Sequence, residues 1–191
     1  MNTAIATLVI LNLAMIGLLP IVFFRRDGQL NGAWLITAAP FFASTAFLLL
    51  GLGGFLQAQF AFNAWLTPIA NLAAIVAAVA SVTLIGLTVG VHRVPLALWH
   101  QQNDAPVEIV TWGPYAHVRH PFYSSFMLTL LAVFLVLPHF LTLATFAYAL
   151  IALTVTARGE EQRLLVSRFG PQYRSYYSNT GRFLPRLGAN R

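Results

Sequence analysis

Four long apolar runs constrain the fold of this 191-residue chain more than any other feature. About 20 apolar residues let a helix span the hydrocarbon core of a bilayer, which is about 30 Å thick. The first three runs therefore predict one crossing each, and the fourth predicts a helical hairpin because a proline breaks it. The runs are Ile5 to Phe24, Trp34 to Leu56, Pro68 to Val91, and Phe122 to Ala157 with an interruption at Pro138 and His139.

The composition supports a membrane protein. Hydrophobic residues make up 58% of the chain and charged residues 8%, and the mean hydropathy is +0.73, outside the usual range of soluble domains. We expect an all-α integral membrane protein with five transmembrane helices, folded as one domain over residues 1–191, in which residues 1–91 supply the first three helices. Gly86 and Gly90, four residues apart, are expected to lie at a helix contact.

The cationic residues favour the lipid bilayer as partner. All eleven are arginine, so the net charge of +6 cannot be lost by deprotonation and must lie at an interface or be paired. No basic stretch lies on a soluble fold, which argues against nucleic acid as a partner. Cysteine is absent, which excludes disulfides, thiolate metal sites and a cysteine nucleophile.

The arginines follow the first, third and fifth crossings, and none lies in residues 57–67 or at the turn around Pro138. The positive-inside rule then predicts an N-terminus outside the cell and a C-terminal tail in the cytosol. Most other polar groups that carry chemistry fall on the same side: His92, His100, Asp104, Glu108, His117, His120, Glu160 and Glu161. A membrane enzyme with a charged, water-soluble cosubstrate needs its polar groups collected in this way.

The densest polar segment, residues 109–123, comes directly before the fourth run. Gly113-Pro114 predicts a turn, and Pro121 suits the first position of a helix, where its missing N–H costs nothing. Arg119 and His120 then lie at a helix entrance, where free N–H groups attract an anion. A basic interfacial anchor is one alternative, and a haem or metal site is another, although the histidine spacing does not favour a metal.

The segment after the fifth crossing is predicted to continue that helix until Gly170-Pro171 stops it. Adjacent helical residues point about 100° apart, so only one of Glu160 and Glu161 is expected to face inward. The alternative is a solvated ladder in which Arg158 pairs with Glu161 and Glu160 with Arg163.

Taken together, these segments resemble the isoprenylcysteine carboxyl methyltransferase family and its prokaryotic relatives over about the last 80 residues. The motifs appear in the family's order. They are Val-Thr-x-Gly-Pro-Tyr at Val110 to Tyr115, Arg119-His120-Pro121-x-Tyr123, Glu160-Glu161 followed by Phe169-Gly170-x-x-Tyr173-x-x-Tyr176, and Arg182-Phe183-Leu184-Pro185. One departure is Ser125, where the family often has glycine.

The resemblance implies a methyltransferase that uses S-adenosyl-L-methionine (SAM), with residues 92–191 as the catalytic core: cofactor loop, fourth and fifth helices, and tail. Glu160 or Glu161 would hold the cofactor's polar end, and its carboxylate would lie near Arg119 and His120. Arg158 or Arg182 would meet the acceptor or brace the glutamates, which makes Arg158, Glu161 and Arg182 the expected catalytic residues. The cofactor would be lined by Tyr115, His117, Val118, His120, Pro121 and Tyr123.

The resemblance also bears on the acceptor and the location. It implies a lipophilic or membrane-delivered acceptor that presents a carboxylate, amine or thiol, with a prenylated or lipid molecule as one possibility. Methyl transfer to such a lone pair needs positioning and electrostatics more than acid–base help, so we assign no general base. The prokaryotic relatives indicate the cytoplasmic membrane, with the active site facing the cytosol.

Two other classes remain open from the sequence. Membrane sterol and enone reductases share an Arg-His-Pro-like element but use NADPH, and the glutamate pair argues against a phosphate-rich ligand while the tail arginines argue for one. A non-catalytic membrane scaffold would bind neither cofactor.

Overall fold

The computed structural model describes residues 1–17, 24, 28–60, 62–91 and 109–186, and these segments are helical with no strand among them. The all-α prediction is therefore confirmed. The helices are α1 (Thr3–Gly17), α2 (Gly32–Leu52), α3 (Leu66–Val91), α4 (Pro121–Val136), α5 (Phe140–Leu165) and α6 (Gly170–Asn179), and a short 3₁₀ helix, η1 (Gly113–Ala116), precedes α4.

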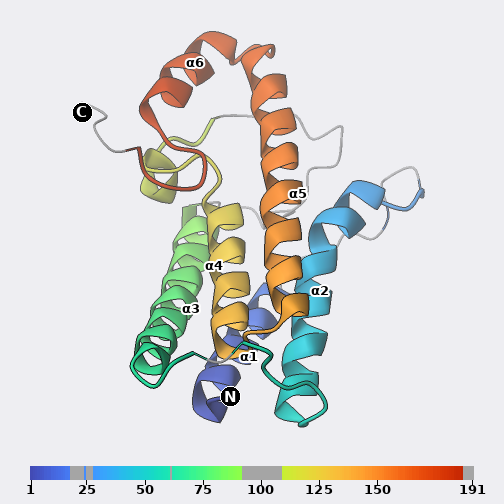
Figure 1. Ribbon diagram of the computed structural model, residues 1–191. Helices are drawn as coiled ribbons and strands as arrows, with labels where there is room; N and C mark the ends of the chain where they lie inside the picture. The colour runs from blue at the N-terminus through green and yellow to red at the C-terminus, as the bar shows by residue number, and fades with distance from the viewer. Residues whose placement is uncertain (18–23, 25–27, 61, 92–108, 187–191) are drawn as a thin grey trace.

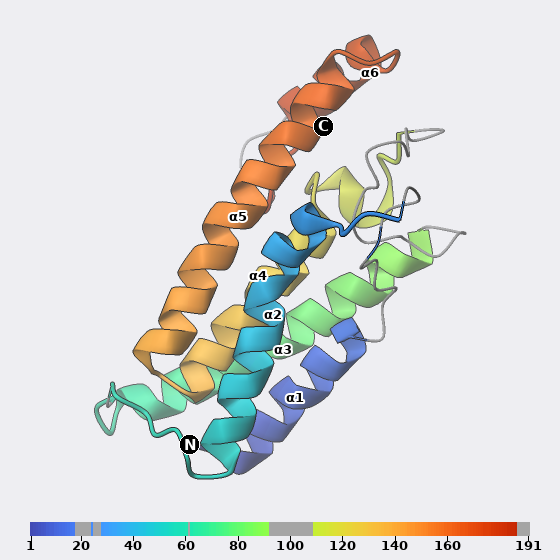
Figure 2. The ribbon, with the colours of Figure 1, turned by 90° about the vertical axis from the view of Figure 1, so that its right-hand side faces the viewer.

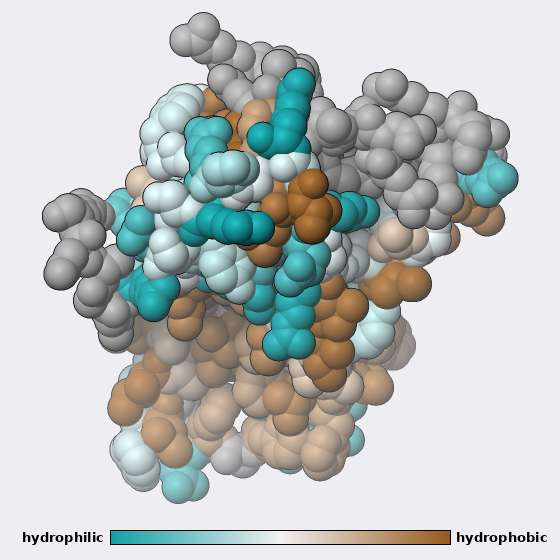
Figure 3. Space-filling view, turned by 90° about the horizontal axis from the view of Figure 1, so that it is seen from above, coloured by the Kyte–Doolittle hydropathy of each residue, from teal (hydrophilic) through white to brown (hydrophobic). Residues whose placement is uncertain are grey.

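The first five helices form a bundle, and consecutive helices run in opposite directions (Figure 1). The N-terminus lies at the end that carries the turns after α2 and α4. The opposite end carries η1, α6 and the C-terminal part of α5, which extends well past the start of α4 in both side views (Figures 1 and 2). Viewed onto this second end, hydrophilic side chains gather over the bundle (Figure 3).

Three helices are long and apolar enough to cross a membrane: α2, α3 and α5. α1 and α4 are apolar but shorter, with 15 and 16 residues. At about 1.5 Å per residue, α4 is about 24 Å long, somewhat less than a typical hydrocarbon core. The structure thus confirms apolar membrane-type helices, while the count of five crossings and the orientation stay predictions.

The break between α4 and α5 confirms the predicted hairpin. His139 begins α5 by capping: its Nδ1 accepts the N–H of Leu141 at 3.0 Å, and Thr142 completes a capping box. The carbonyl of Pro138 accepts two N–H groups from the loop after α2, those of Gln59 at 2.9 Å and Phe60 at 3.0 Å. The two turns at this end of the bundle are therefore joined by backbone hydrogen bonds.

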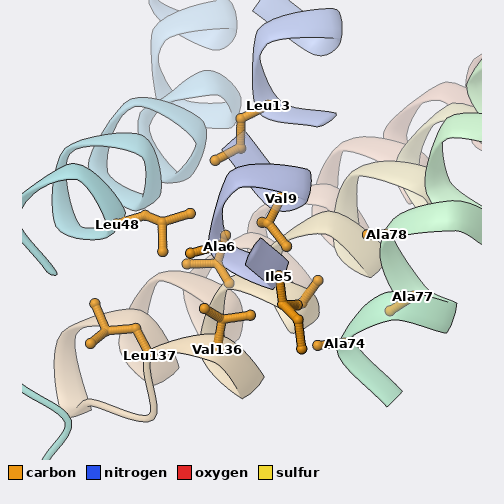
Figure 4. Packing of buried hydrophobic residues seen from close by; sticks show 12 residues of the cluster. Ile5, Ala6, Val9, Leu13, Leu48, Ala74, Ala77, Ala78, Val136 and Leu137 are labelled. Carbon is orange, nitrogen blue, oxygen red and sulfur yellow. The ribbon is translucent and has the colours of Figure 1, made fainter. Parts of the chain in front are cut away.

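α1 packs against α2, α3 and the end of α4 (Figure 4). Small buried residues of α3, namely Ala74, Ala77 and Ala78, allow the helices to approach closely. The glycine prediction is wrong, because a Cβ added at Gly86 or Gly90 would meet nothing within 4 Å. Alanine supplies the close approach that the sequence pattern assigned to glycine.

The prediction that Gly170-Pro171 ends the helix of the fifth crossing is also wrong. α5 ends at Leu165, and Gly170 and Pro171 form the first turn of α6. Proline is favoured there because the first N–H groups of a helix have no intrahelical partner. A Cβ at Gly170 would lie 2.5 Å from the carbonyl oxygen of Leu165, so the turn between the two helices needs glycine at this position.

Candidate functional site

The loop before α4 and the tail after α6 lie side by side. The N–H of Arg119 donates to the carbonyl of Gly181 at 2.8 Å, and the N–H of His120 donates to the carbonyl of Arg182 at 3.0 Å. Val118 and Gly181 form an isolated parallel bridge. These backbone bonds bring two segments that are about 60 residues apart in the sequence to the entrance of α4.

Two glycines make this arrangement possible. Gly113 begins η1 with a φ of +62°, and a Cβ there would lie 2.7 Å from the Val91 side chain at the end of α3. At Gly181 a Cβ would overlap the carbonyl oxygen of Leu184, so the tail can turn there only with glycine. The loop and the tail are thus shaped by close backbone approaches.

Glu161 is the centre of an ionic cluster. Its carboxylate accepts the Nε–H of Arg119 at 2.8 Å on Oε1 and the NH2 group of Arg182 at 2.6 Å on Oε2. The Nε–H of Arg182 lies 3.1 Å from both oxygens. The side chain of Glu161 is only 2% exposed, so its charge is compensated by two arginines rather than by water.

Arg119 is held on several sides. Its NH1 group donates to the carbonyl of Tyr177 at 3.1 Å and to the carbonyl of Thr180. Its guanidinium carbon also lies 4.1 Å from the centre of the Tyr177 ring, a cation–π distance. Arg119 therefore joins α4, α5 and α6 through contacts within the protein.

Glu160 has different partners. Its Oε1 accepts the hydroxyl of Tyr123 at 2.9 Å, and its Oε2 lies 3.4 Å from Nδ1 of His120. Its side chain is 10% exposed, and no arginine in the described segments forms an ion pair with it. Within the described segments, Glu160 is thus a buried carboxylate whose ionic contact is with His120 rather than with an arginine.

The His120 ring lies between the two glutamates. Nδ1 faces Glu160, and Nε2 lies 3.4 Å from Oε1 of Glu161, without hydrogen-bond geometry to any described residue. The His120 ring stacks on the Tyr123 ring, with centroids 5.3 Å apart and an angle of 2° between the planes. The Phe183 ring packs edge-to-face with the His120 ring, with centroids 6.1 Å apart. The prediction that only one glutamate faces inward is wrong, since both contact His120.

Charge and burial shift the ionisation of these groups. Glu161 lies beyond the apolar part of α5, which ends at Ala157. Burial alone would raise the pKa of its carboxyl, but contacts with His120, Arg182 and Arg119 hold that pKa well below its ordinary value. Burial raises the pKa of Tyr176 to about 12, and its hydroxyl donates to the Tyr115 carbonyl at 2.7 Å. The cluster therefore keeps an ionised Glu161 and a neutral Tyr176 across the physiological range.

The structure brings most of the sequence-predicted site residues into one cluster: Arg119, His120, Tyr123, Glu160, Glu161 and Arg182. Val118 and Pro121 are buried beside it, and Tyr115 is half-buried. His117 and Arg158 are exposed. The solvated-ladder alternative is wrong, because both glutamates are buried. His92, His100, Asp104 and Glu108 lie outside the described residues.

Sequence reasoning missed Tyr177, Thr180 and Phe183 as parts of the cluster. Tyr177 was detectable, because Tyr173, Tyr176 and Tyr177 share the three- and four-residue spacing of one helix face. Thr180 contributes a backbone carbonyl, and Phe183 contributes a ring edge and a carbonyl that accepts the Ser124 hydroxyl at 2.7 Å. Backbone contributions of this kind leave no signal in residue type.

Fold and site together define an α-helical protein with membrane-type helices and a buried ionic cluster at one end of its bundle. The isoprenylcysteine carboxyl methyltransferase (ICMT) family model matches residues 97–166, which confirms the resemblance carried by the motifs and indicates a membrane methyltransferase. The match includes the Arg119 to Tyr123 segment and both glutamates, whereas α1 to α3 precede it and α6 and Arg182 follow it. No curated protein matches the chain.

Proposed function

We propose that this chain is an integral membrane methyltransferase that uses SAM as methyl donor and modifies a lipophilic or membrane-delivered acceptor. The single observation that carries the proposal is the contrast between Glu160 and Glu161. Glu161 is saturated by two arginines, whereas Glu160 is buried beside Tyr123 and His120 with no arginine partner in the described part of the chain. A buried carboxylate that faces only a histidine and a tyrosine hydroxyl among the described residues favours a cationic ligand, because an added positive charge offsets the cost of its burial.

The residues present fit the cationic and aromatic parts of SAM. Glu160 would hold its ammonium, and the stacked rings of His120 and Tyr123 offer apolar faces with polar edges. The sequence-based expectation also placed the ligand's carboxylate beside Arg119. The Nε and NH1 groups of Arg119 are already bound by Glu161, Tyr177 and Thr180, so we assign Arg119 to bracing and leave His120 as the ligand contact.

Glu161 and Arg182 are assigned the same bracing role. Glu161 joins α5 to the loop before α4 through Arg119 and to the tail through Arg182. These ion pairs therefore position the Glu160 and His120 side chains. Arg182 is 23% exposed and lies at the edge of the cluster, from which it can also meet the polar group of an acceptor. Arg158 is exposed on α5 and has no assigned contact within this cluster.

When bound, SAM supplies an electrophilic methyl group, and transfer to a lone pair is an in-line displacement. The chain's part is to orient both partners, to exclude water and to supply a fixed electrostatic field. An apolar cluster shares Tyr123 with the ionic one and includes Phe122, Phe126, Leu153 and Ala157. We assign the lipophilic part of the acceptor to this side and leave its reactive carboxylate, amine or thiol open.

Calorimetric binding of S-adenosylhomocysteine (SAH) to the detergent-purified protein tests the proposal. Wild type is expected to bind SAH saturably and NADPH not at all. Glu160→Gln is expected to weaken SAH binding at least about tenfold, because a buried charge pair with the ligand is lost, with little change in thermal stability. Glu161→Gln is the comparison, expected to lower stability as well because it leaves two arginines without their carboxylate.

Arg174→Gln, an exposed change on α6, controls for a general effect of charge. Binding of NADPH but not SAH would show a reductase, binding of neither would show a scaffold, and equal SAH affinity in wild type and Glu160→Gln would refute the assignment of Glu160. Membrane lipids and small molecules labelled from methyl-tritiated SAM would then identify the acceptor.

A further inference from the structure

Four polar side chains meet inside the apolar bundle, at a distance from the ionic cluster. Asn12 of α1, Ser81 of α3 and Ser125 and Thr129 of α4 are each 0–1% exposed. Ser81 Oγ and Thr129 Oγ1 lie 2.7 Å apart, and the Thr129 hydroxyl also lies 3.2 Å from Oδ1 of Asn12. We call these four residues the polar junction.

The polar junction is complete within the protein. The amide of Asn12 donates to the carbonyl of Ala78 at 2.8 Å, and its Oδ1 lies 3.5 Å from the Ser81 hydroxyl. Polar side chains in apolar spans are costly, and they are retained where they hold helices in register or line a functional path. Because its groups are already hydrogen-bonded, the junction needs no ligand and points to the first of these roles.

The hydrogen bonds continue from the junction to the start of α4. The Ser81 hydroxyl lies 2.8 Å from the carbonyl of Ser125, and the Ser125 hydroxyl donates to the carbonyl of Phe122 at 2.7 Å. Phe122 stands in the first turn of α4, next to Tyr123. A series of bonds thus runs from α1 and α3, which precede the family match, to the turn that carries the site.

We infer that the polar junction is a positioning device for the ionic cluster. It fixes the rotation of α4 and its position along the helix axis relative to α1 and α3. As a consequence, it fixes where Arg119, His120 and Tyr123 contact the two glutamates of α5. No member of the junction lies on α5, so the two halves of the site are held from different parts of the bundle. Its effect on cofactor affinity rests on the proposed function, but its effect on the geometry of α4 does not.

Hydrogen–deuterium exchange in lipid nanodiscs tests the positioning directly. The reporters are the amides of Arg119 and His120, which donate to the tail carbonyls. Ser81→Ala is expected to speed their exchange at least about threefold to twentyfold, the range that corresponds to one interhelical hydrogen bond in a membrane, since the Ser81 hydroxyl contacts both Ser125 and Thr129. The matched control is Thr88→Val, which removes a buried hydroxyl of the same helix that bonds only the carbonyl of Leu84 in its own helix.

SAH affinity provides the second readout. Ser81→Ala should weaken SAH binding by a similar factor, Ser81→Thr should restore it because the hydroxyl is kept, and Thr88→Val should leave it near the wild-type value. Equal exchange and equal affinity in Ser81→Ala and Thr88→Val would refute the inference. If wild type binds no SAH, the proposed function fails, and the exchange comparison alone still decides whether the junction positions α4.

Discussion

The Oε2 atom of Glu161 and the NH2 group of Arg182 lie 2.6 Å apart, although 21 residues separate them in the sequence. Between them the chain leaves α5, forms α6 and returns along the loop before α4. The pair is therefore the side-chain contact that joins the tail to α5, beside the backbone bonds that join the tail to the loop before α4. Its loss should open the cluster while leaving the apolar bundle intact.

Arg182→Gln tests this contact. Glu161 would keep Arg119 but lose its bidentate partner. We expect a loss of about 1 kcal/mol in unfolding free energy, less than the ~1.5–3 kcal/mol typical of a hydrogen bond to a charged group, because Arg182 is 23% exposed to water. SAH binding should weaken in parallel. Arg182→Lys should recover only part of both, since one ammonium cannot make two parallel bonds to a carboxylate. Full recovery by lysine would contradict the geometry.

Gly181→Ala should disrupt the tail more than its size suggests. The added Cβ would overlap the Leu184 carbonyl, so the turn that places Arg182 cannot form as observed. We expect a destabilisation of about 2 kcal/mol or more, measured by thermal unfolding, together with loss of SAH binding. Gly159→Ala is the matched control, because a Cβ there on α5 meets nothing within 4 Å and alanine favours a helix. Equal effects of the two changes would argue against the tight turn.

The tyrosines of the cluster should ionise late in an alkaline titration. Burial raises the pKa of Tyr176 from 10.0 to about 12. Since the folded pKa is raised, the stabilisation by neutral Tyr176 is complete below pH 10 and is lost as the pH rises through 12. Tyrosinate absorbance should therefore show a component near pH 12 that Tyr176→Phe removes, while Tyr115 and Tyr173, whose pKa values burial also raises, still ionise late. An unchanged component near pH 12 in that variant would assign that component to another tyrosine.

Tyr148→Phe should weaken the contact between α2 and α5. Pro40 inside α2 has no N–H for the carbonyl of Ile36, and the Tyr148 hydroxyl donates to that carbonyl at 3.0 Å. In an apolar surrounding, the loss of this hydrogen bond should lower the free energy of unfolding by about 1 kcal/mol.

Pro40→Ala supplies the missing N–H and completes the double-mutant cycle. In that background Tyr148→Phe should cost much less, because Ile36 regains an intrahelical partner. Thermal unfolding of all four proteins measures the coupling. An equal cost of Tyr148→Phe in both backgrounds would show that the hydroxyl does not replace the lost helix bond.

Structural features that depend only on residues adjacent in the sequence could be predicted from the sequence. Pro121 begins α4, and the break at Pro138 separates α4 from α5, because a missing N–H is tolerated only at such places. The same logic failed at Gly170-Pro171. A proline after a helix can end it or begin the next one, and the short turn from Val166 to Phe169 that decides between these outcomes has no distinct local pattern.

The prediction for the glutamates failed for a different reason. Their side chains do point in different directions from α5, but the loop before α4 and the tail flank that helix closely enough to supply a buried partner in each direction. His120 fills the space between them. The angle between adjacent residues says nothing about how many neighbouring segments surround a helix.

The polar junction was beyond sequence reasoning. Its partners are separated by 44 residues for Ser81 and Ser125 and by 117 for Asn12 and Thr129. Each is an ordinary small polar residue inside an apolar run. Which of them meet depends on the rotation of three helices about their axes, and that rotation is set by packing of the whole bundle rather than by local propensity.

The return of the tail to Arg119 also orders the biosynthesis of the protein. The loop and both glutamates emerge from the ribosome before Arg182, so Glu161 lacks one of its two arginines until the tail follows. Completion of the cluster must wait until residue 182 has been translated and has folded back. The ionic cluster is therefore the last part of the described chain to mature, and a chain that ended within α6 would lack a finished site.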